Sequence, residues 1–201
     1  MIPTYEEESR GPHPVCGVDE AGRGPLAGPV VAAAVILDAD ALPDGVADSK
    51  VLTAARREAL FDLIMTRAHV GVGRAEVAEI DRLNILWATM LAMERAVAAL
   101  PRQPTMVLID GNRAPKWHRA CRTIVKGDAK CISIAAASIV AKVTRDRLMK
   151  DLARHYPAYG WETNQGYGTP PHHRALTAHG ATMHHRRSFA PVRAVLNKAC
   201  N

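Results

Sequence analysis

The sequence has few cysteines and no long apolar run. Its four cysteines, Cys16, Cys121, Cys131 and Cys200, contain no Cys-x-x-Cys pair, which disfavours a disulfide framework or a zinc site and favours reduced, mostly buried thiols. No stretch approaches the roughly 20 apolar residues that cross a bilayer. The acidic first ten residues are also unlike a signal peptide. We therefore expect a cytoplasmic protein without a membrane partner.

Acidic residues are scarce near the C-terminus. Residues 142–201 carry 10 Lys and Arg against 3 Asp and Glu, whereas residues 1–141 carry 16 against 17. A basic segment on a near-neutral body favours a polyanion partner such as nucleic acid over a surface that only aids solubility. The same segment holds two histidine pairs, His172-His173 and His184-His185. They lack cysteine partners and the fixed spacing of a zinc site, so we predict surface positions near phosphate.

The length and composition are those of one globular unit. A chain of 201 residues with 48% hydrophobic and 23% charged residues can bury a full core. Three consecutive glutamates and three prolines predict a flexible leader over residues 1–14. Residues 15–154 are expected to form the core of the fold. The basic residues 155–201 are expected to form an appendage of loops and short helices packed on that core.

Two acids follow directly after the first predicted strand. Val15 to Val18 and Val30 to Leu37 have strand composition, and the glycines and prolines between them indicate a connection of the hairpin type. Asp19 and Glu20 therefore lie where a core strand ends, and burying adjacent carboxylates there is costly. A divalent cation would offset that cost. The alternative is that both acids are solvated turn residues.

The rest of the chain alternates helices and strands. Asn84 is a suitable N-cap for a helix, and Pro101 ends it. Two further strands run straight into acids, Asp110 and Asp128. This order predicts an α/β fold with a site at the sheet edge. The predicted elements are a helix from Thr53, a strand over Val70 to Val77, a helix over Ile85 to Leu100, strands over Thr105 to Ile109 and Arg122 to Val125, a long helix from Ala129 to about Arg154, and short helices over Pro170 to His179 and Ala190 to Lys198.

Three strand ends thus present carboxylates. A cluster of oxygen ligands favours hard cations such as Mg²⁺ or Mn²⁺. Because neighbouring strand residues point to opposite faces, Asp19 and Glu20 cannot both face one ion unless the backbone twists. Gly22 and Gly24 would permit that twist, or Glu20 would contribute through its carbonyl. The sequence leaves both routes open.

Five separated motifs occur in register along nearly the whole chain. They are GVDEAGRGPLAGPVV from Gly17, DSK from Asp48, LIDGN from Leu108, KGDAKCISIAAASIVAKVTRD from Lys126 and NQGYGT from Asn164. From about Val15 to about Arg193 the chain resembles bacterial ribonuclease HII, the type 2 ribonuclease H. The resemblance implies a ribonuclease H-like mixed central sheet flanked by helices. It also implies that Asp19, Glu20, Asp110 and Asp128 are the catalytic, metal-binding acids.

The function that follows from this resemblance is endonucleolytic. The chain would hydrolyse the RNA strand of RNA–DNA hybrids and nick duplex DNA 5′ of single embedded ribonucleotides. Two metal ions would activate water and leave 3′-hydroxyl and 5′-phosphate ends. No histidine adjoins the acids, which disfavours a histidine-based ribonuclease mechanism. We expect a monomer.

The resemblance also assigns substrate contacts. Gly22-Arg23-Gly24 would sense the ribonucleotide, because flanking glycines let main-chain groups approach a 2′-hydroxyl closely. The alternative is a tight turn with Arg23 in solvent. Tyr167, between two glycines, would stack on the sugar, or would plug the interface between lobes. Candidates for backbone phosphates are Lys50, Lys142, Arg145 and Arg186, although Lys142 and Asp146 also have the spacing of a helix ion pair.

The alternatives are a type 3 ribonuclease H or another nuclease of the same fold, and a non-catalytic DNA-binding module. A type 3 ribonuclease H usually carries an extra N-terminal domain and a lysine where Arg23 stands, and only 14 residues precede the first strand here. A non-catalytic DNA-binding module would use the basic C-terminal segment. Four acids at strand ends would repel DNA without metal, which counts against that second alternative.

Overall fold

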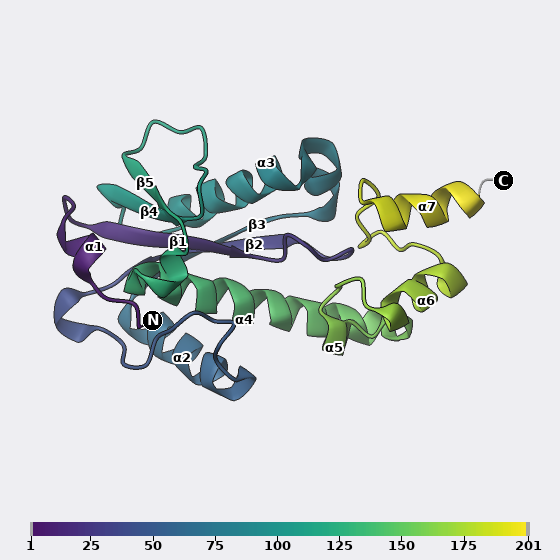
Figure 1. Cartoon of the computed structure of the whole chain (residues 1–201), viewed down its shortest axis with the longest axis horizontal. Coiled ribbons are helices and arrows are strands. Elements are labelled where there is room, and N and C mark those ends of the chain that lie inside the picture. The colour runs from purple at the N-terminus through teal and green to yellow at the C-terminus, as the bar shows by residue number, and fades with distance from the viewer. Residues whose placement is uncertain (1, 200–201) are drawn as a thin grey trace.

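A five-stranded mixed sheet is the centre of the computed structural model, which describes residues 2–199. The strand order is β3-β2-β1-β4-β5, with β1 antiparallel to β2, β2 antiparallel to β3, and β1-β4 and β4-β5 parallel. The mixed sheet predicted from the sequence is confirmed (Figure 1). The strands are β1 (Val15–Ala21), β2 (Val30–Ile36), β3 (His69–Ala75), β4 (Met106–Asp110) and β5 (Cys121–Ile124).

Helices cover both faces of this sheet. Helix α3 (Val77–Ala98) packs on one face, while α4 (Ile132–His155) and α2 (Ala54–Arg67) pack on the other (Figure 1). Between these layers every residue of β2 is buried, which explains its continuous apolar sequence. Strand β1 extends three residues beyond its predicted end, so Asp19 and Glu20 lie inside the strand.

The helix predicted to begin after Asn84 is the second half of a longer one. Helix α3 starts at Val77 and is interrupted at Asn84, where φ is 65° and ψ is 165°. The Asn84 side-chain oxygen accepts hydrogen bonds from the backbone N–H of Leu86 at 3.0 Å and of Trp87 at 3.3 Å. The predicted capping role of Asn84 is therefore confirmed, although the cap lies at a kink rather than at the helix start.

Helix α4 lies unusually close to β1. A Cβ atom placed on Gly17 would stand 2.3 Å from the backbone nitrogen of Ile134, so only glycine permits this approach. The helix begins three residues later than predicted, because η2 (Gly127–Ala129) forms a separate 3-10 turn before it. That turn carries Asp128 toward the end of β1.

The N-terminal segment packs on the core, in contrast to the flexible leader that was expected. Its short helix α1 (Glu6–Ser9) places Glu8 in a fully buried position. One Glu8 carboxylate oxygen accepts hydrogen bonds from the backbone N–H of Ser133 at 2.8 Å and from its hydroxyl at 2.6 Å. Thr4 also exchanges backbone hydrogen bonds with Lys130 and Ile132. The leader therefore caps the start of α4.

A helical lobe follows α4 at the end of the molecule opposite α1 (Figure 1). Its core contains Tyr159 and Trp161, which pack with Ala27 from the β1–β2 connection and Met149 from α4. Its elements are η3 (Pro157–Tyr159), α5 (Trp161–Asn164), α6 (Pro170–His179) and α7 (Ala190–Ala199). The remaining short element, η1 (Ala39–Ala41), lies after β2.

Within residues 2–199 no helix is long and apolar enough to cross a membrane. Cys16 and Cys131 are buried free thiols and Cys121 is a partly buried one, as expected. Cys200 lies outside the described residues.

Candidate active site

Asp19 and Glu20 occupy the end of β1 and keep the alternation of a strand. Residues Cys16 and Val18 face α3, which places Glu20 on that side, whereas Gly17 and Asp19 face α4. Both carboxylates nevertheless line one cleft, because the strand ends there and Glu20 reaches the cleft from the other face. The Asp19 carboxylate turns back and accepts a hydrogen bond from the Glu20 N–H at 2.6 Å.

Burial shapes the protonation of these two acids. Asp19 is 5% exposed, and its burial, with the charges of Glu20 and Asp110 nearby, raises its pKa well above the ordinary value. Burial also raises the pKa of Glu20, opposed by Arg23, whose guanidinium lies 3.1 Å from the Glu20 carboxylate. The end of β1 therefore holds negative charge at an energetic cost.

Asp110 and Asp128 complete the cluster from the neighbouring strands. Asp110 ends β4, which runs parallel to β1, so their carboxyl ends meet. Its carboxylate accepts a hydrogen bond from the Gly127 N–H at 2.7 Å, and its pKa is raised chiefly by burial. Asp128 in η2 is buried, and its carboxylate lies 3.1 Å from the Lys50 ammonium. All four predicted acids are thus brought to one edge of the sheet.

Three of these acids, Asp19, Glu20 and Asp110, line a cleft of about 310 Å³. The opposite wall of the cleft comes from the loop after β1 and from the C-terminal lobe. The residues that line it are Asp19, Glu20, Ala21, Gly22, Arg23, Gly24, Ser49, Lys50, Asp110, Ser138, Lys142, Arg145 and Tyr167. A larger hollow of about 420 Å³ lies by the start of β1 and is lined by none of the four acids.

The Gly22–Gly24 loop and Tyr167 lie against each other in this cleft. Gly22 has a φ of +94°, and a Cβ there would stand 1.9 Å from the Arg145 side chain, so the loop requires glycine. A Cβ on Gly24 would lie 3.4 Å from the Tyr167 ring. The Tyr167 side chain is 46% exposed and faces the cleft rather than the lobe interior. The predicted recognition residues are therefore adjacent.

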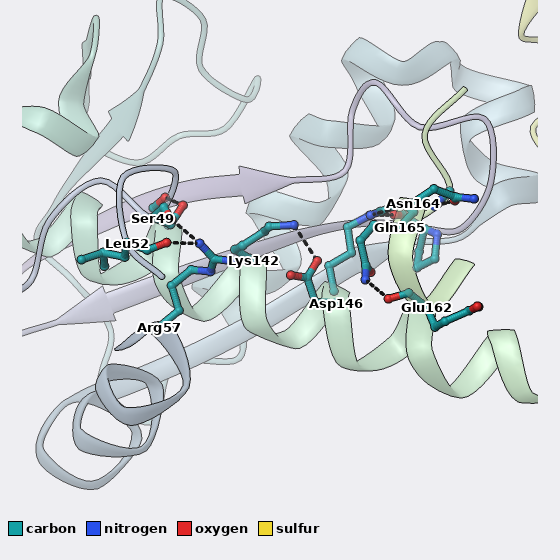
Figure 2. A network of polar contacts seen from close by, with 12 residues as sticks. Ser49, Leu52, Arg57, Lys142, Asp146, Glu162, Asn164 and Gln165 are labelled. Carbon is teal, nitrogen blue, oxygen red and sulfur yellow. Dashed lines mark hydrogen bonds and ion pairs between the residues drawn. The ribbon is translucent and has the colours of Figure 1, made fainter. Parts of the chain in front are cut away.

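Lys50 and Lys142 lie at the rim among the acids. Lys50 sits in a loop that Arg57 anchors by donating to the carbonyls of Ser49 at 2.8 Å and Leu52 at 2.6 Å. Figure 2 shows this anchor and the ion pair between Lys142 and Asp146. That pair, at 2.7 Å, is the helix pair considered as the alternative for Lys142. Both lysines nonetheless line the cleft.

Arg145 and Arg186 have a different environment from the one predicted. Both are buried, and each guanidinium donates to backbone carbonyls rather than facing a phosphate. Arg145 donates to Pro29, Gln165 and Ala27 at 3.0, 3.0 and 3.1 Å. Arg186 donates to Gly22, Gly28, Arg23 and Pro29 at 2.6, 2.9, 2.9 and 3.3 Å. These residues hold the β1–β2 connection in place.

The prediction that the histidine pairs are surface residues is wrong for one member of each. His172 and His185 are fully buried and lie 3.1 Å apart through their Nε2 atoms. Burial lowers the pKa of both rings, that of His185 to about 3. They are neutral packing residues beside Trp161. Of the other two members of the pairs, His173 is exposed and His184 is partly buried.

Two cleft residues escaped the sequence interpretation. Ser49 and Ser138 share a hydrogen bond of 2.7 Å and line the cleft beside Lys50. Ser49 lies inside the DSK motif, and Ser138 follows three alanines of α4. Each lies in a motif that also contains a predicted substrate contact, Lys50 for Ser49 and Lys142 for Ser138. That proximity is the sequence feature that could have indicated them.

The donors at the cleft are all oxygen atoms of carboxylates. Among the described residues, no three Asp, Glu, His or Cys side chains are already gathered as closely as a metal site requires. The chemistry of the set still suits a hard divalent cation, because burial and mutual repulsion raise the pKa of three of the acids. The carboxylates would need to rotate inward to share an ion.

Comparisons with known proteins agree with this geometry. The family model for ribonuclease HII matches residues 16–192. The chain is 61% identical over 190 residues to ribonuclease HII of Rhizorhabdus wittichii, covering 94% of each chain. It is 60% identical over 185 residues to ribonuclease HII of Paracoccus denitrificans, covering 92% of this chain and 88% of that one.

A solved structure supports the fold as well. The crystal structure of ribonuclease H2 from Pyrococcus horikoshii OT3 is similar with a TM-score of 0.76 and 29% identity, covering 92% of this chain and 97% of that one. The ribonuclease H-like architecture is therefore confirmed. Matched in its motifs, its sheet and nearly its whole length, this chain belongs to the ribonuclease HII family of endoribonucleases.

Proposed function

We propose that the protein cleaves at ribonucleotides paired with DNA. It hydrolyses the RNA strand of RNA–DNA hybrids and nicks duplex DNA 5′ of a single embedded ribonucleotide, leaving 3′-hydroxyl and 5′-phosphate ends. One observation carries this proposal: Asp19, Glu20 and Asp110 line the same cleft as the Gly22–Gly24 loop and Tyr167. The fourth acid, Asp128, is paired with Lys50, which also lines that cleft. A group suited to phosphodiester hydrolysis and a group suited to sensing a sugar are thus within reach of one nucleotide.

Asp19, Glu20, Asp110 and Asp128 would hold the cofactor, which we propose to be two Mg²⁺ or Mn²⁺ ions. The support is the all-carboxylate donor set, in which burial, together with neighbouring carboxylates, raises the pKa of Asp19, Glu20 and Asp110. When bound, such ions supply Lewis-acid stabilisation of the charge that develops at a phosphodiester. Lys50, held by Asp128, is placed to attract a phosphate oxygen once that carboxylate turns to a cation.

The loop beside the acids would read the sugar. Gly22 and Gly24 expose main-chain groups on either side of Arg23, and a 2′-hydroxyl can both donate to and accept from such groups. Tyr167 presents its ring against Gly24, where it would stack on the same sugar. Arg23, paired with Glu20, would link the loop to the acid cluster. Lys142 would contact a backbone phosphate after exchanging its partner Asp146.

The test uses a DNA duplex that contains one ribonucleotide in one strand. After treatment with a chelator, the protein should leave this duplex intact, and added Mg²⁺ or Mn²⁺ should restore a single nick. An all-DNA duplex of the same sequence is the control. End-group analysis should show a 3′-hydroxyl and a 5′-phosphate. A cyclic phosphate 3′ of the ribonucleotide would contradict the proposal, since it would mean that the 2′-hydroxyl attacked.

We also propose that the protein acts as a monomer in the cytoplasm, where bacterial DNA resides. All the elements that build the cleft come from one chain. Light scattering at the concentrations used for the nicking assay would test the monomer. A dimer at those concentrations would contradict it.

A further inference from the structure

The loop that carries Tyr167 is anchored by the buried side chain of His172. Tyr167 lies between α5 and α6, and its carbonyl oxygen accepts a hydrogen bond from the Thr169 N–H at 2.8 Å. The Nδ1 atom of His172 also lies 2.8 Å from that oxygen. His172 is fully buried in the first turn of α6, so solvent does not compete for this contact. The exposed ring and the buried anchor thus belong to one short segment.

The surrounding donors determine where the His172 proton resides. The Nε1–H of Trp161, which can only donate, lies 3.1 Å from His172 Nε2. Nε2 must therefore be an acceptor, and the single proton of the neutral ring sits on Nδ1. A carbonyl oxygen can only accept, so His172 donates to Tyr167. The bond to the recognition loop depends on this one tautomer.

The hydrogen bonds of His185 agree with this tautomer of His172. Its Nδ1 atom lies 3.0 Å from the backbone N–H of Thr182 and accepts from it. The proton of its neutral ring is therefore on Nε2, which lies 3.1 Å from His172 Nε2. His172 Nε2 is shared by two donors, Trp161 and His185. Burial, which lowers the pKa of both rings, agrees with their neutral state.

Arg186, which follows His185 in the chain, contacts the Gly22–Gly24 loop. Arg186 donates to the carbonyls of Gly22 and Arg23 at 2.6 and 2.9 Å. The adjacent residues 185 and 186 therefore hold, respectively, the anchor of Tyr167 and the Gly22–Gly24 loop. The contact between Tyr167 and Gly24 is set by this common support.

We propose that His172, oriented by Trp161 and His185, is a positioning residue that determines ribonucleotide specificity by fixing Tyr167 against the Gly22–Gly24 loop. This inference rests on the proposed function, in which Tyr167 stacks on the sugar. His172 itself touches no substrate, being buried beneath the loop. Its loss should therefore weaken recognition of a lone ribonucleotide and leave the metal requirement of the acids unchanged.

The test compares two amide substitutions at one position. In His172→Asn the side-chain N–H₂ can take the place of Nδ1 and keep the bond to Tyr167. In His172→Gln the amide reaches the place of Nε2 and the bond to Tyr167 is lost. With one hydrogen bond at stake, we expect His172→Gln to lose about tenfold in kcat/KM on a single embedded ribonucleotide, mainly through KM. His172→Asn should remain within about threefold, and both should keep their Mg²⁺ dependence.

A second comparison shows whether His172 acts through Tyr167. In a Tyr167→Ala background, His172→Gln should cause no further loss in the preference for a single ribonucleotide over a continuous RNA strand. Additive losses, or equal losses in the Asn and Gln variants, would overturn the positioning role. If Tyr167→Ala alone leaves that preference intact, the proposed role of Tyr167 fails, which is a distinguishable result.

A measurement on the unaltered protein serves if the variants do not fold. Nitrogen-15 NMR of the imidazole rings reports the tautomer of each histidine. We expect the Nδ1–H form for His172 and the Nε2–H form for His185. An Nε2–H form for His172 would overturn the proposal, because that ring could not donate to Tyr167.

Discussion

The buried arginines and the buried acids of this molecule differ in how fully hydrogen bonds compensate their charge. Arg145 and Arg186 direct their guanidinium groups at backbone carbonyls, three for the first and four for the second. Burial lowers the pKa of Arg145 to about 10 and of Arg186 to about 9, so both stay charged at neutral pH. Their hydrogen-bonding capacity is used within the fold.

The acids across the cleft lack such compensation. Asp19 and Asp110 each accept a backbone hydrogen bond, yet burial and neighbouring carboxylates raise the pKa of both. A buried charge whose donors are matched stabilises one conformation, whereas buried like charges favour a ligand of opposite sign. The arginines are therefore structural, whereas the acids are the metal site that we propose.

The largest effect should come from removing one acid. Asp110→Asn keeps the volume of the side chain but removes a charge from the cluster, so cleavage should fall by at least about 100-fold. Because like charges are relieved, the metal-free variant should be as stable as the parent or more so. Nicking rates and thermal unfolding in a chelator measure the two effects. Asp62→Asn, at an exposed position on α2, is the control. A stable variant with near-parental activity would remove Asp110 from the site.

Replacing the buried Arg186, unlike replacing Asp110, should lower the free energy of unfolding. A lysine at position 186 has no planar fork and cannot serve four carbonyls at once, so Arg186→Lys should cost roughly 3 kcal/mol of unfolding free energy. Arg187→Lys is the matched control, since the neighbouring Arg187 is exposed. Urea unfolding of both variants measures the difference. Equal midpoints in the two variants would mean that the guanidinium contacts at position 186 contribute little.

The sequence predicted the acids and the sheet for one reason. Asp19 and Asp110 follow apolar strand residues, and Asp128 lies in the turn after β5. The parallel order of β1, β4 and β5 brings these strand ends together. The pattern that reveals a strand therefore also places its terminal carboxylate. The exposed position of Tyr167 was accessible as well, because flanking glycines mark a loop.

The sequence did not predict that the two arginines and two histidines are buried, because their hydrogen-bond partners leave no pattern in the sequence. Arg186 is bound by carbonyls of residues about 160 positions earlier, and every residue type supplies a carbonyl. A lone basic residue is usually exposed, so composition alone predicts a solvated surface for it. The ring nitrogens of His172 and His185 hydrogen-bond with each other, with Trp161, with the Thr182 hydroxyl and with nearby backbone groups. Such mutual satisfaction exists only in the folded chain.

Glu8 is a buried acid outside the cleft, and among the described residues only one of its two carboxylate oxygens has hydrogen-bond partners. One of its oxygens accepts two hydrogen bonds from Ser133, at the start of α4. Glu8→Ala should therefore lower the unfolding free energy by about 2 kcal/mol while the folded enzyme keeps its activity. Glu6→Ala, on the exposed side of the same helix, is the control. Urea unfolding together with nicking rates tests this. A loss of activity without a loss of stability would place Glu8 among the catalytic acids.

The smallest effect concerns the response of the metal-free protein to pH and Mg²⁺. Because the pKa values of Asp19, Glu20 and Asp110 are raised on folding, the folded state retains protons that the unfolded state releases. The stability that these groups contribute is thus present at low pH and is lost as pH rises through the raised pKa values. Buried His172 and His185 have lowered pKa values and titrate with the opposite sign. The informative quantity is therefore the difference in unfolding temperature with Mg²⁺ and with chelator at each pH.

That difference should grow from pH 5.5 to pH 8, since protons and Mg²⁺ compete for the same carboxylates. At ten times the dissociation constant, one bound ion stabilises the folded state by about 1.4 kcal/mol, or roughly 3–5 °C for a chain of this size. In Asp110→Asn the Mg²⁺-dependent shift should shrink, whereas in Arg187→Lys it should match the parent. A shift that is equal at both pH values and unchanged in Asp110→Asn would show that the cluster is not where Mg²⁺ binds. The contrast between the two sets of charges would then rest on the arginines alone.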